Sequence, residues 1–179
     1  MKENKLFIIV KPLVLLTVML LSITVNAQKE KMQTAFIYQL TRLVEWCPEG
    51  KEGNFIVAIV GDEPELLSQL LALQVRRVGS QQIEVKSYPN VNAVGKANIL
   101  FVPKSQLGVV DQIAKKAGGA CTLIVSDEEA AARNGAGAGV SLVFNVREGK
   151  LEFYINRSYM SDRSFNVNRQ LYDLATRVY

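Results

Sequence analysis

The sequence contains no histidine, and it has only two cysteines and one tryptophan. Histidine is the commonest general base and metal ligand, so its absence removes the usual hydrolase triads and many metal sites. Two cysteines do not complete a structural zinc site without two other strong ligands. Phosphate-binding loops, nucleophile elbows and kinase motifs are also missing. The sequence thus shows no motif for catalysis, metal binding or cofactor binding, and we expect a protein that is not an enzyme.

Long apolar runs are also lacking, including at the N-terminus. Three lysines there (Lys2, Lys5 and Lys11) precede a nine-residue apolar segment, Leu13–Leu21. Small residues, Val25 and Ala27, then occupy the −3 and −1 positions relative to the expected cleavage site. A membrane-spanning helix needs roughly 20 apolar residues, so an uncleaved anchor is the weaker interpretation. The order of charged, apolar and small residues is typical of a secretory signal peptide. We predict a signal peptide over residues 1–27, cleavage after Ala27, and a periplasmic chain of residues 28–179 without stable membrane insertion.

The positive charge is small and does not indicate nucleic-acid binding. The formal net charge is +4, and removal of Lys2, Lys5, Lys11 and Glu3 with the signal peptide lowers it to +2. The basic doublets at 76–77 and 115–116 are not interleaved with aromatic residues, as a nucleic-acid surface would be. We interpret both doublets as solvated surface.

Three apolar runs, each followed by a predicted helix, organise the middle of the chain. The runs are Phe55–Val60, Asn98–Val102 and Cys121–Val125, and the predicted helices cover residues 65–71, 106–117 and 126–133. Continuous apolar strands that alternate with helices indicate a parallel sheet covered on both faces. The alternating segment Gln81–Tyr88 is typical of a strand near the sheet edge.

The two ends of the domain are predicted to be helical. An apolar stripe, from Met32 through Phe36, Leu40, Leu43 and Val44 to Cys47, predicts a first helix that Pro48 stops. A similar stripe predicts a closing helix over residues 166–178. Residues 140–146 and 151–155 are expected to pair as a hairpin that forms one antiparallel sheet edge. The expected fold is a single three-layer α/β domain with a mostly parallel sheet, a C-terminal hairpin and helices on both faces.

The segment Asn134–Gly139 is rich in glycine, but it does not match a dinucleotide-binding loop. That fingerprint follows a strand and opens a helix, whereas this segment follows a predicted helix and opens a strand. We interpret it as a flexible connection, with a mobile lid as the alternative.

Polar residues follow the buried strands at the edge where parallel α/β sheets usually bind ligands. Asp62 follows the first strand, Lys104 the second and Asp127 the third. Helix capping accounts for Asp62, which stands three residues before Glu65, and for Ser126 before Glu129. A ligand-binding crevice formed by Asp62, Lys104 and Asp127 is the alternative.

Trp46 and the two cysteines are the remaining candidates for a special role. Trp46, beside Glu45, is either a core anchor or part of a partner-binding surface. Cys47 ends the first predicted helix and Cys121 begins a parallel strand, so both are expected near the amino edge of the sheet. Export would place them where disulfides persist. We predict a Cys47–Cys121 disulfide, with two buried free thiols as the alternative, because the strand order is not known from the sequence.

The order of six motifs resembles the YfiR/HmsC-like family of periplasmic regulators. The matching segments are Ala35–Tyr38, Leu43–Trp46 with Pro48, Phe55–Asp62, Asn98–Val102 with Thr122–Asp127, Leu151–Asn156 and Val167–Ala175. The resemblance implies a protein without catalytic activity that binds a membrane-anchored signalling enzyme, such as a diguanylate cyclase or a sensor kinase. It also implies links to cyclic-di-GMP and biofilm formation, the formation of homodimers, and a response to redox state.

Two functions of different classes therefore compete. The leading hypothesis is a regulator that holds a signalling enzyme inactive. The alternative is a small-molecule receptor that uses the crevice at the carboxyl edge of the sheet, and a secreted hydrolase is a distant third. A deep pocket at that edge would favour the receptor, whereas an exposed apolar patch would favour the regulator.

Overall fold

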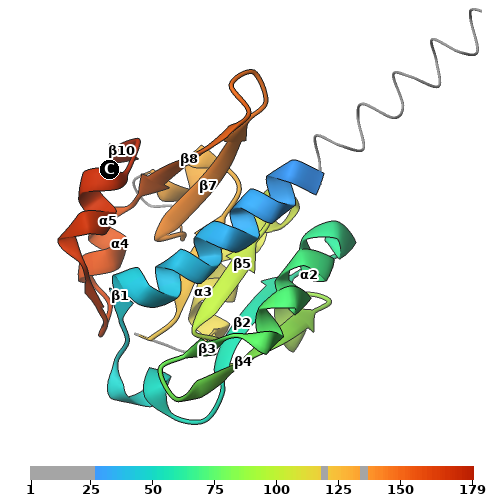
Figure 1. The fold of residues 1–179 in the computed structure, drawn as a ribbon, viewed down its shortest axis with the longest axis vertical. Helices are drawn as coiled ribbons and strands as arrows, with labels where there is room; N and C mark the ends of the chain where they lie inside the picture. Colours follow the sequence, from blue (N-terminus) through green and yellow to red (C-terminus); the bar gives the residue numbers. More distant parts are fainter. Residues whose placement is uncertain (1–26, 118–120, 134–136) are drawn as a thin grey trace, which may run out of the picture.

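A computed structural model describes residues 27–117, 121–133 and 137–179, and these residues are built around an eight-stranded sheet (Figure 1). The strand order is β10-β8-β7-β6-β5-β2-β4-β3. The strands, in chain order, are β2 (Phe55–Val60), β3 (Arg77–Val78), β4 (Gln81–Tyr88), β5 (Ile99–Val102), β6 (Leu123–Ser126), β7 (Val140–Asn145), β8 (Lys150–Ile155) and β10 (Arg177–Val178). The predicted α/β fold is confirmed.

The strands at the centre of the sheet are parallel and are covered on both faces. β2 pairs in parallel with β4 and β5, and β5, β6 and β7 continue the parallel pairing. Every residue of β2 is buried, as its unbroken apolar run predicts. The order β4-β2-β5-β6-β7 places the first parallel strand between the second and the third, as in flavodoxin-like sheets. The point where the strand order reverses lies between β2 and β5.

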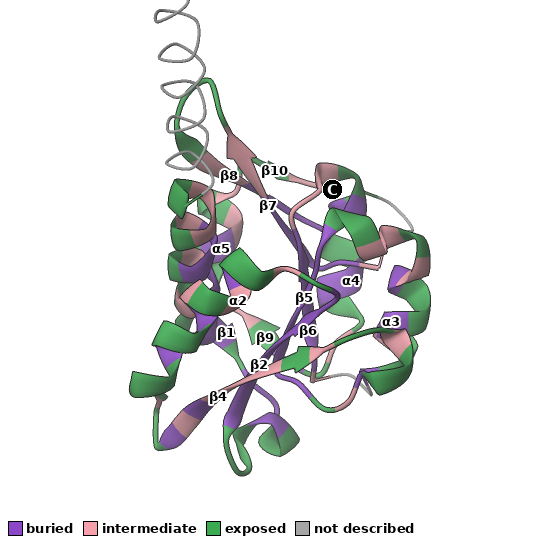
Figure 2. Cartoon of the chain, turned by 90° about the vertical axis from the view of Figure 1, so that its right-hand side faces the viewer, coloured by how far each residue is buried: buried purple, intermediate pink, exposed green. Residues whose placement is uncertain are grey.

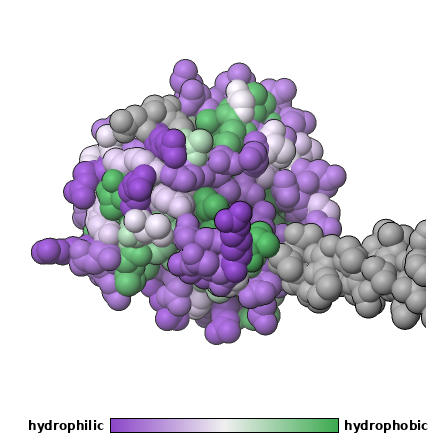
Figure 3. Space-filling view, turned by 90° about the horizontal axis from the view of Figure 1, so that it is seen from above, coloured by the Kyte–Doolittle hydropathy of each residue, from purple (hydrophilic) through white to green (hydrophobic). Residues whose placement is uncertain are grey.

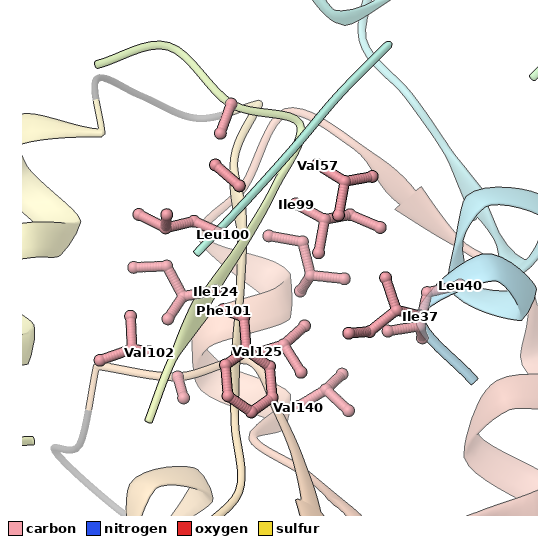
Figure 4. Close-up of a cluster of buried hydrophobic side chains, with 14 of the residues drawn as sticks. Ile37, Leu40, Val57, Ile99, Leu100, Phe101, Val102, Ile124, Val125 and Val140 are labelled. Atoms are coloured by element: carbon pink, nitrogen blue, oxygen red, sulfur yellow. The ribbon is translucent and has the colours of Figure 1, made fainter. Parts of the chain in front are cut away.

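Helices cover both faces of the sheet. The N-terminal helix (residues 27–43) and α2 (Pro64–Leu71) lie over one face, and α3 (Val110–Lys116) lies over the other (Figures 1 and 2). Ile37 and Leu40 of the N-terminal helix point towards Val57 and Ile99 in the core (Figure 4). Shorter elements complete the chain: α4 (Arg157–Ser161), α5 (Arg169–Leu174) and 3-10 turns at Pro48–Lys51, Ala72–Val75, Val91–Ala93, Lys104–Val109 and Glu129–Ala132.

The predicted C-terminal end of the first helix is wrong, whereas its apolar stripe is confirmed in part: Leu40, Val44 and Cys47 are buried, and Phe36 and Leu43 pack against the core. The helix stops at residue 43, and Val44–Glu45 forms the short strand β1, so Pro48 is not what ends it. The face against the sheet carries Ile37 and Leu40 together with Gln33, Thr34 and Thr41, whereas Met32, Phe36 and Leu43 are half-buried. Phe36 packs against Phe153, a core residue of β8, with ring centroids 4.5 Å apart.

The predicted closing helix is divided into three elements. Asn166–Val167 forms β9, which pairs antiparallel with β1, and α5 occupies only Arg169–Leu174. β10 then pairs in parallel with β8. The β7–β8 hairpin is confirmed, with Leu142 opposite Phe153. It is not the edge of the sheet, however, because β10 lies outside it.

Two predicted helix starts also differ from the structure. The N-cap of α2 is Glu63, whose side chain makes no capping hydrogen bond, so Asp62 does not cap this helix. After β6 the chain makes only a 3-10 turn, and the Ser126 hydroxyl accepts a hydrogen bond from the backbone N–H of Glu128. The glycine-rich segment lies partly outside the described residues, at 134–136. Its last residue, Gly139, packs so closely on Tyr159 that an added Cβ would lie 2.6 Å from the ring.

Candidate functional site

The residues predicted to bind a ligand lie near the carboxyl edge of the sheet, where two of the three, Lys104 and Asp127, make polar contacts within the chain. The Lys104 ammonium lies 2.7 Å from the Glu128 carboxylate, and the Lys104 backbone N–H donates to Asp127 at 2.7 Å. The other oxygen of Asp127 lies 3.2 Å from the ammonium of Lys29, on the N-terminal helix. Asp62 is exposed. The charges of Lys104 and Asp127 are thus already matched within the chain.

Side chains of two turns also meet at the place where the strand order reverses. A Cβ added to Gly61, just after β2, would lie 3.2 Å from Cγ of Gln106. The Ser105 hydroxyl is 3.4 Å from a carboxylate oxygen of Glu63. The turn after β5 therefore packs against the turn after β2, at the point where a sheet of this order would hold a ligand.

Glu63 is a carboxyl group at this edge whose environment changes its pKa. Burial raises the pKa of the Glu63 carboxyl, and the negative charge of Asp127 raises it further. The positive charge of Lys29 and the hydrogen bond from Ser105 act in the opposite direction. The raised pKa means that the folded state binds a proton on Glu63 more tightly than the unfolded state does.

Glu45 and Trp46, the residues predicted to contact a partner, differ in burial. Glu45 is exposed on β1, where it is paired with Asn166 of β9. Trp46 is only 5% exposed, and its indole N–H donates to the carbonyl of Thr41 at 3.3 Å. The Trp46 ring packs against the rings of Phe55 and Phe165, at centroid distances of 5.1 and 5.7 Å. Of the two interpretations of Trp46, the structure favours the core anchor.

The predicted disulfide between Cys47 and Cys121 is confirmed. Cys47 follows β1, Cys121 lies just before β6, and their Cα atoms are 5.9 Å apart. The predicted placement explains the bond, since both residues reach the amino edge of the parallel sheet. The bond ties the connection after the N-terminal helix to a central strand.

Two buried polar side chains, those of Asn98 and Gln81, hold the turn that carries Cys47. The amide of Asn98 donates to the carbonyl of Gly50 at 2.7 Å, and its oxygen accepts from the N–H of Ile56 at 2.8 Å. The amide of Gln81 also donates to the carbonyls of Gly50 and Gly53, at 3.2 and 3.1 Å. Buried polar groups satisfied in this way fix a unique conformation, so the turn is held independently of the disulfide.

A cavity of about 420 Å³ opens beside the disulfide, at the amino edge of the sheet. Glu49 and Cys121 line one side of it, and Lys96 and Lys116 line another. The ammonium of Lys96 donates to the backbone carbonyl of Glu49, and that of Lys116 to the carbonyl of Asn92, each at 3.2 Å. The cavity is thus at the opposite edge from the crevice that the sequence suggested.

One group of residues near this cavity has the composition of a metal site. The potential ligand atoms of Cys47, Glu49 and Cys121 all lie within 4.8 Å of one another. A disulfide sulfur is not the thiolate that metals bind, so this group is not a metal site while the cysteines are bridged.

The sequence matches a known protein family. The YfiR/HmsC-like family matches residues 30–176, which is most of the chain. The chain belongs to the YfiR/HmsC-like family. No curated protein matches it in a sequence comparison. The family match agrees with the resemblance found from the six motifs.

Two observations on this YfiR/HmsC-like chain bear on its location. None of the helices among residues 27–117, 121–133 and 137–179 has both the length and the apolar character needed to cross a membrane. The disulfide fits an oxidising compartment such as the periplasm. The predicted signal peptide and most of its cleavage site fall in residues 1–26, which lie outside the described residues.

Sequence reasoning identified the cysteine pair but missed the residues around it. Glu49, Lys96, Asn98 and Lys116 come together only because the starts of β5 and β6 and the turn after β1 share the amino edge. The pattern Cys47-Pro48-Glu49 was the one local signal, since it puts a carboxylate two residues from a cysteine.

Proposed function

We propose that this chain is a periplasmic regulator that binds a membrane-anchored signalling enzyme, of the diguanylate cyclase or sensor kinase type, and holds it inactive. The family match over residues 30–176 carries this proposal, because the best-known relatives act in this way on cyclic-di-GMP signalling. The function requires a binding surface and no reactive centre, which suits a chain without histidine.

The carboxyl edge of the sheet supports a regulator more than a receptor. A receptor needs unpaired polar groups that converge on an open crevice. Here Lys104 and Asp127 pair with Glu128 and Lys29, and Gln106 lies over Gly61. A ligand entering this edge would have to break those ion pairs. The receptor interpretation of Asp62, Lys104 and Asp127 remains a prediction, and none of these contacts favours it.

The surface beside the N-terminal helix has the composition of a protein–protein interface. Leu71 and Val75 are 45% and 85% exposed, at the end of α2 and in the turn that follows it. Tyr38 lies on the neighbouring helix, with the guanidinium groups of Arg42 and Arg76 at 5.1 and 5.7 Å from its ring centroid. Exposed apolar residues next to Tyr and Arg are enriched where proteins bind one another. We call Tyr38, Arg42, Leu71, Val75 and Arg76 the Tyr38–Val75 surface.

Figure 3 shows one face of the molecule, seen from above. This face is largely hydrophilic, and apolar side chains form separate patches on it. The partner contact involves the Tyr38–Val75 surface and exposed Glu45, whereas Trp46 contributes by holding β1 in place. A homodimer that leaves this surface free is compatible with the proposal.

Export is part of the same proposal. The signal peptide is cleaved after Ala27, and the protein acts in the periplasm as the chain that begins at Gln28. N-terminal sequencing of the exported protein tests this, and an intact chain starting at Met1 in the membrane fraction would contradict it. Lys29, which pairs with Asp127, remains in the mature chain.

Site-specific crosslinking tests the binding role. A photoreactive amino acid at Val75 or at Glu45 should capture an integral membrane protein that carries a cytoplasmic signalling domain. The same amino acid at Val146, which is 68% exposed at the β7–β8 hairpin, serves as the matched control. Equal capture at all three positions, or capture at none, would contradict the proposed surface.

A further inference from the structure

We propose that reduction of the Cys47–Cys121 disulfide converts the turn after β1 into a zinc-binding site formed by Cys47, Glu49 and Cys121. The juxtaposition of two cysteine sulfurs and one carboxylate, beside a cavity that Glu49 and Cys121 line, carries this inference. It does not depend on the proposed regulatory function.

The three side chains supply ligands that zinc prefers. Zinc in proteins is bound by thiolate sulfur and by carboxylate oxygen, and sites with three protein ligands keep a fourth position for water or another ligand. With zinc–sulfur and zinc–oxygen bonds of about 2.3 and 2.0–2.2 Å, tetrahedral geometry puts a sulfur and an oxygen ligand roughly 3.5 Å apart. A carboxylate oxygen of Glu49 lies 3.6 Å from Sγ of Cys121. This distance is already that of one edge of a zinc tetrahedron.

The polypeptide around the site is held in place by contacts other than the disulfide. Asn98 and Gln81 hold the carbonyl of Gly50, and the N–H of Gly50 donates to the carbonyl of Cys47 at 3.0 Å. On the other side, the hydroxyl of Thr122, the residue after Cys121, donates to the carbonyl of Ala97 at 2.7 Å. Breaking the sulfur–sulfur bond therefore leaves both cysteines on anchored backbone. Rotation about a Cα–Cβ bond is enough to separate the sulfurs to the roughly 3.8 Å that two thiolate ligands of one zinc require.

The net charge of the zinc-bound site is also balanced by a nearby lysine. Two thiolates and one carboxylate carry three negative charges, so binding of Zn²⁺ leaves a net charge of −1. The Lys96 ammonium, which donates to the Glu49 backbone carbonyl, lies next to that charge. Lys96 thus opposes the cation without abolishing its binding, and it balances the complex once zinc is bound. The cavity beside Glu49 and Cys121 leaves room for the fourth ligand.

The chemistry has two separate steps. A dithiol reductant gives two electrons and two protons to the disulfide, so that Cys47 and Cys121 become thiols while the reductant becomes a cyclic disulfide. Zinc then replaces the two thiol protons, which pass to water. The redox change switches the metal site on, because a disulfide has no thiolate to offer.

The test uses the purified protein from expression of the full chain, in its disulfide form and after reduction by a phosphine, which does not compete for zinc as a dithiol would. The phosphine takes an oxygen from water to become its oxide, and both sulfurs become thiols. Zinc affinity is measured by competition with a chromophoric chelator, and Co²⁺ is used as a spectroscopic probe. The reduced protein should bind one metal ion and show thiolate-to-cobalt charge-transfer absorption, whereas the disulfide form should show neither.

Matched variants identify the carboxylate ligand. Glu49→Gln should weaken zinc binding by the reduced protein by about tenfold or more, as loss of an interaction at a metal site typically does. Glu52→Gln, a change at an exposed carboxylate in the same connection, should leave the affinity unchanged. The proposal is overturned if the reduced protein binds zinc no more tightly than the disulfide form, or if Glu49→Gln binds as wild type. Loss of the folded circular dichroism spectrum on reduction, with and without zinc, would also overturn it, because the site requires the anchored turn.

Discussion

At the scale of single residues, Trp46 contributes chiefly to stability. Its indole packs between the rings of Phe55 and Phe165, and its N–H is satisfied by the Thr41 carbonyl. Truncation to alanine would leave a large cavity and remove both ring contacts. Such a change in a buried position weakens every function of the chain indirectly, through the folded fraction.

We therefore expect Trp46→Ala to lower the free energy of unfolding by about 3–5 kcal/mol. This is a large share of the roughly 5–15 kcal/mol that keeps a typical domain folded. Chemical denaturation measures it, with Trp46→Phe as the control that keeps an aromatic ring and should cost much less. A Trp46→Ala variant that melts like wild type but fails to bind its partner would instead restore the recognition-surface interpretation.

Glu63 gives the domain a specific dependence on pH. Because burial and Asp127 raise the pKa of the Glu63 carboxyl in the folded state, its contribution to stability is fully present below its unfolded pKa. That contribution is lost as the pH rises through the folded pKa, so ionised Glu63 is unfavourable at neutral pH. Glu63→Gln should therefore melt at a higher temperature than wild type at pH 7, and the difference should shrink as the pH falls towards the ordinary range of a glutamate.

Thermal melts of both proteins across pH test this expectation. Glu52→Gln, a change at an exposed carboxylate before β2 and at the opposite end of that strand from Glu63, is the matched control and should not show the same trend. A melting difference between Glu63→Gln and wild type that grows at acid pH would show that the sign is wrong.

At the scale of elements, the two main errors of sequence reasoning have a single cause. The first helix was predicted to run too far, and the closing helix was predicted over residues 166–178. In the structure, the misassigned Val44–Glu45 and Asn166–Val167 pair with each other as the β1–β9 ribbon, and the Asn168 N–H donates to the Leu43 carbonyl. The local stripes favoured helix, but this pairing joins residues more than 100 positions apart, and periodicity does not report it.

Other elements could be predicted because their signal is local. The buried strands read as unbroken apolar runs, and β4 has the bounds that its alternation gives, Gln81–Tyr88. The disulfide could be predicted because a parallel sheet puts the starts of its strands at one edge. The cavity beside it could not, because Glu49, Lys96 and Lys116 meet only once the strand order is known.

The disulfide joins two elements that are 74 residues apart in the sequence, so its removal should destabilise the domain. The chain-entropy estimate for a loop of this length is about 4 kcal/mol. The double variant Cys47→Ser, Cys121→Ser should lose up to that amount in chemical denaturation, and wild type under reducing conditions without zinc should lose a similar amount. Mass spectrometry of the unreduced protein checks the bond itself, and two thiols that can be alkylated under denaturing conditions would refute it.

At the scale of the whole molecule, the contacts that stabilise the domain lie apart from the surface proposed to bind a partner, as expected of a regulator. At its carboxyl edge, ion pairs join Lys29 to Asp127 and Lys104 to Glu128, and at its amino edge the disulfide joins Cys47 to Cys121. The Tyr38–Val75 surface joins the N-terminal helix to the end of α2 and to the turn before the edge strand β3. A standard interface covers about 800 Å² on each partner, an area that one face of a domain of this size can provide.

The most direct test of regulation by binding is the signalling output of cells that lack the protein. In the native host, deletion should raise cyclic-di-GMP, or the phosphorylated form of the partner kinase, and expression of the wild-type chain should restore the original level. Val75→Asp, a charge on the Tyr38–Val75 surface at a residue that is 85% exposed, should fold normally and fail to restore it. Unchanged cyclic-di-GMP and kinase phosphorylation in the deletion strain, together with turnover of a substrate by the purified protein, would contradict the account.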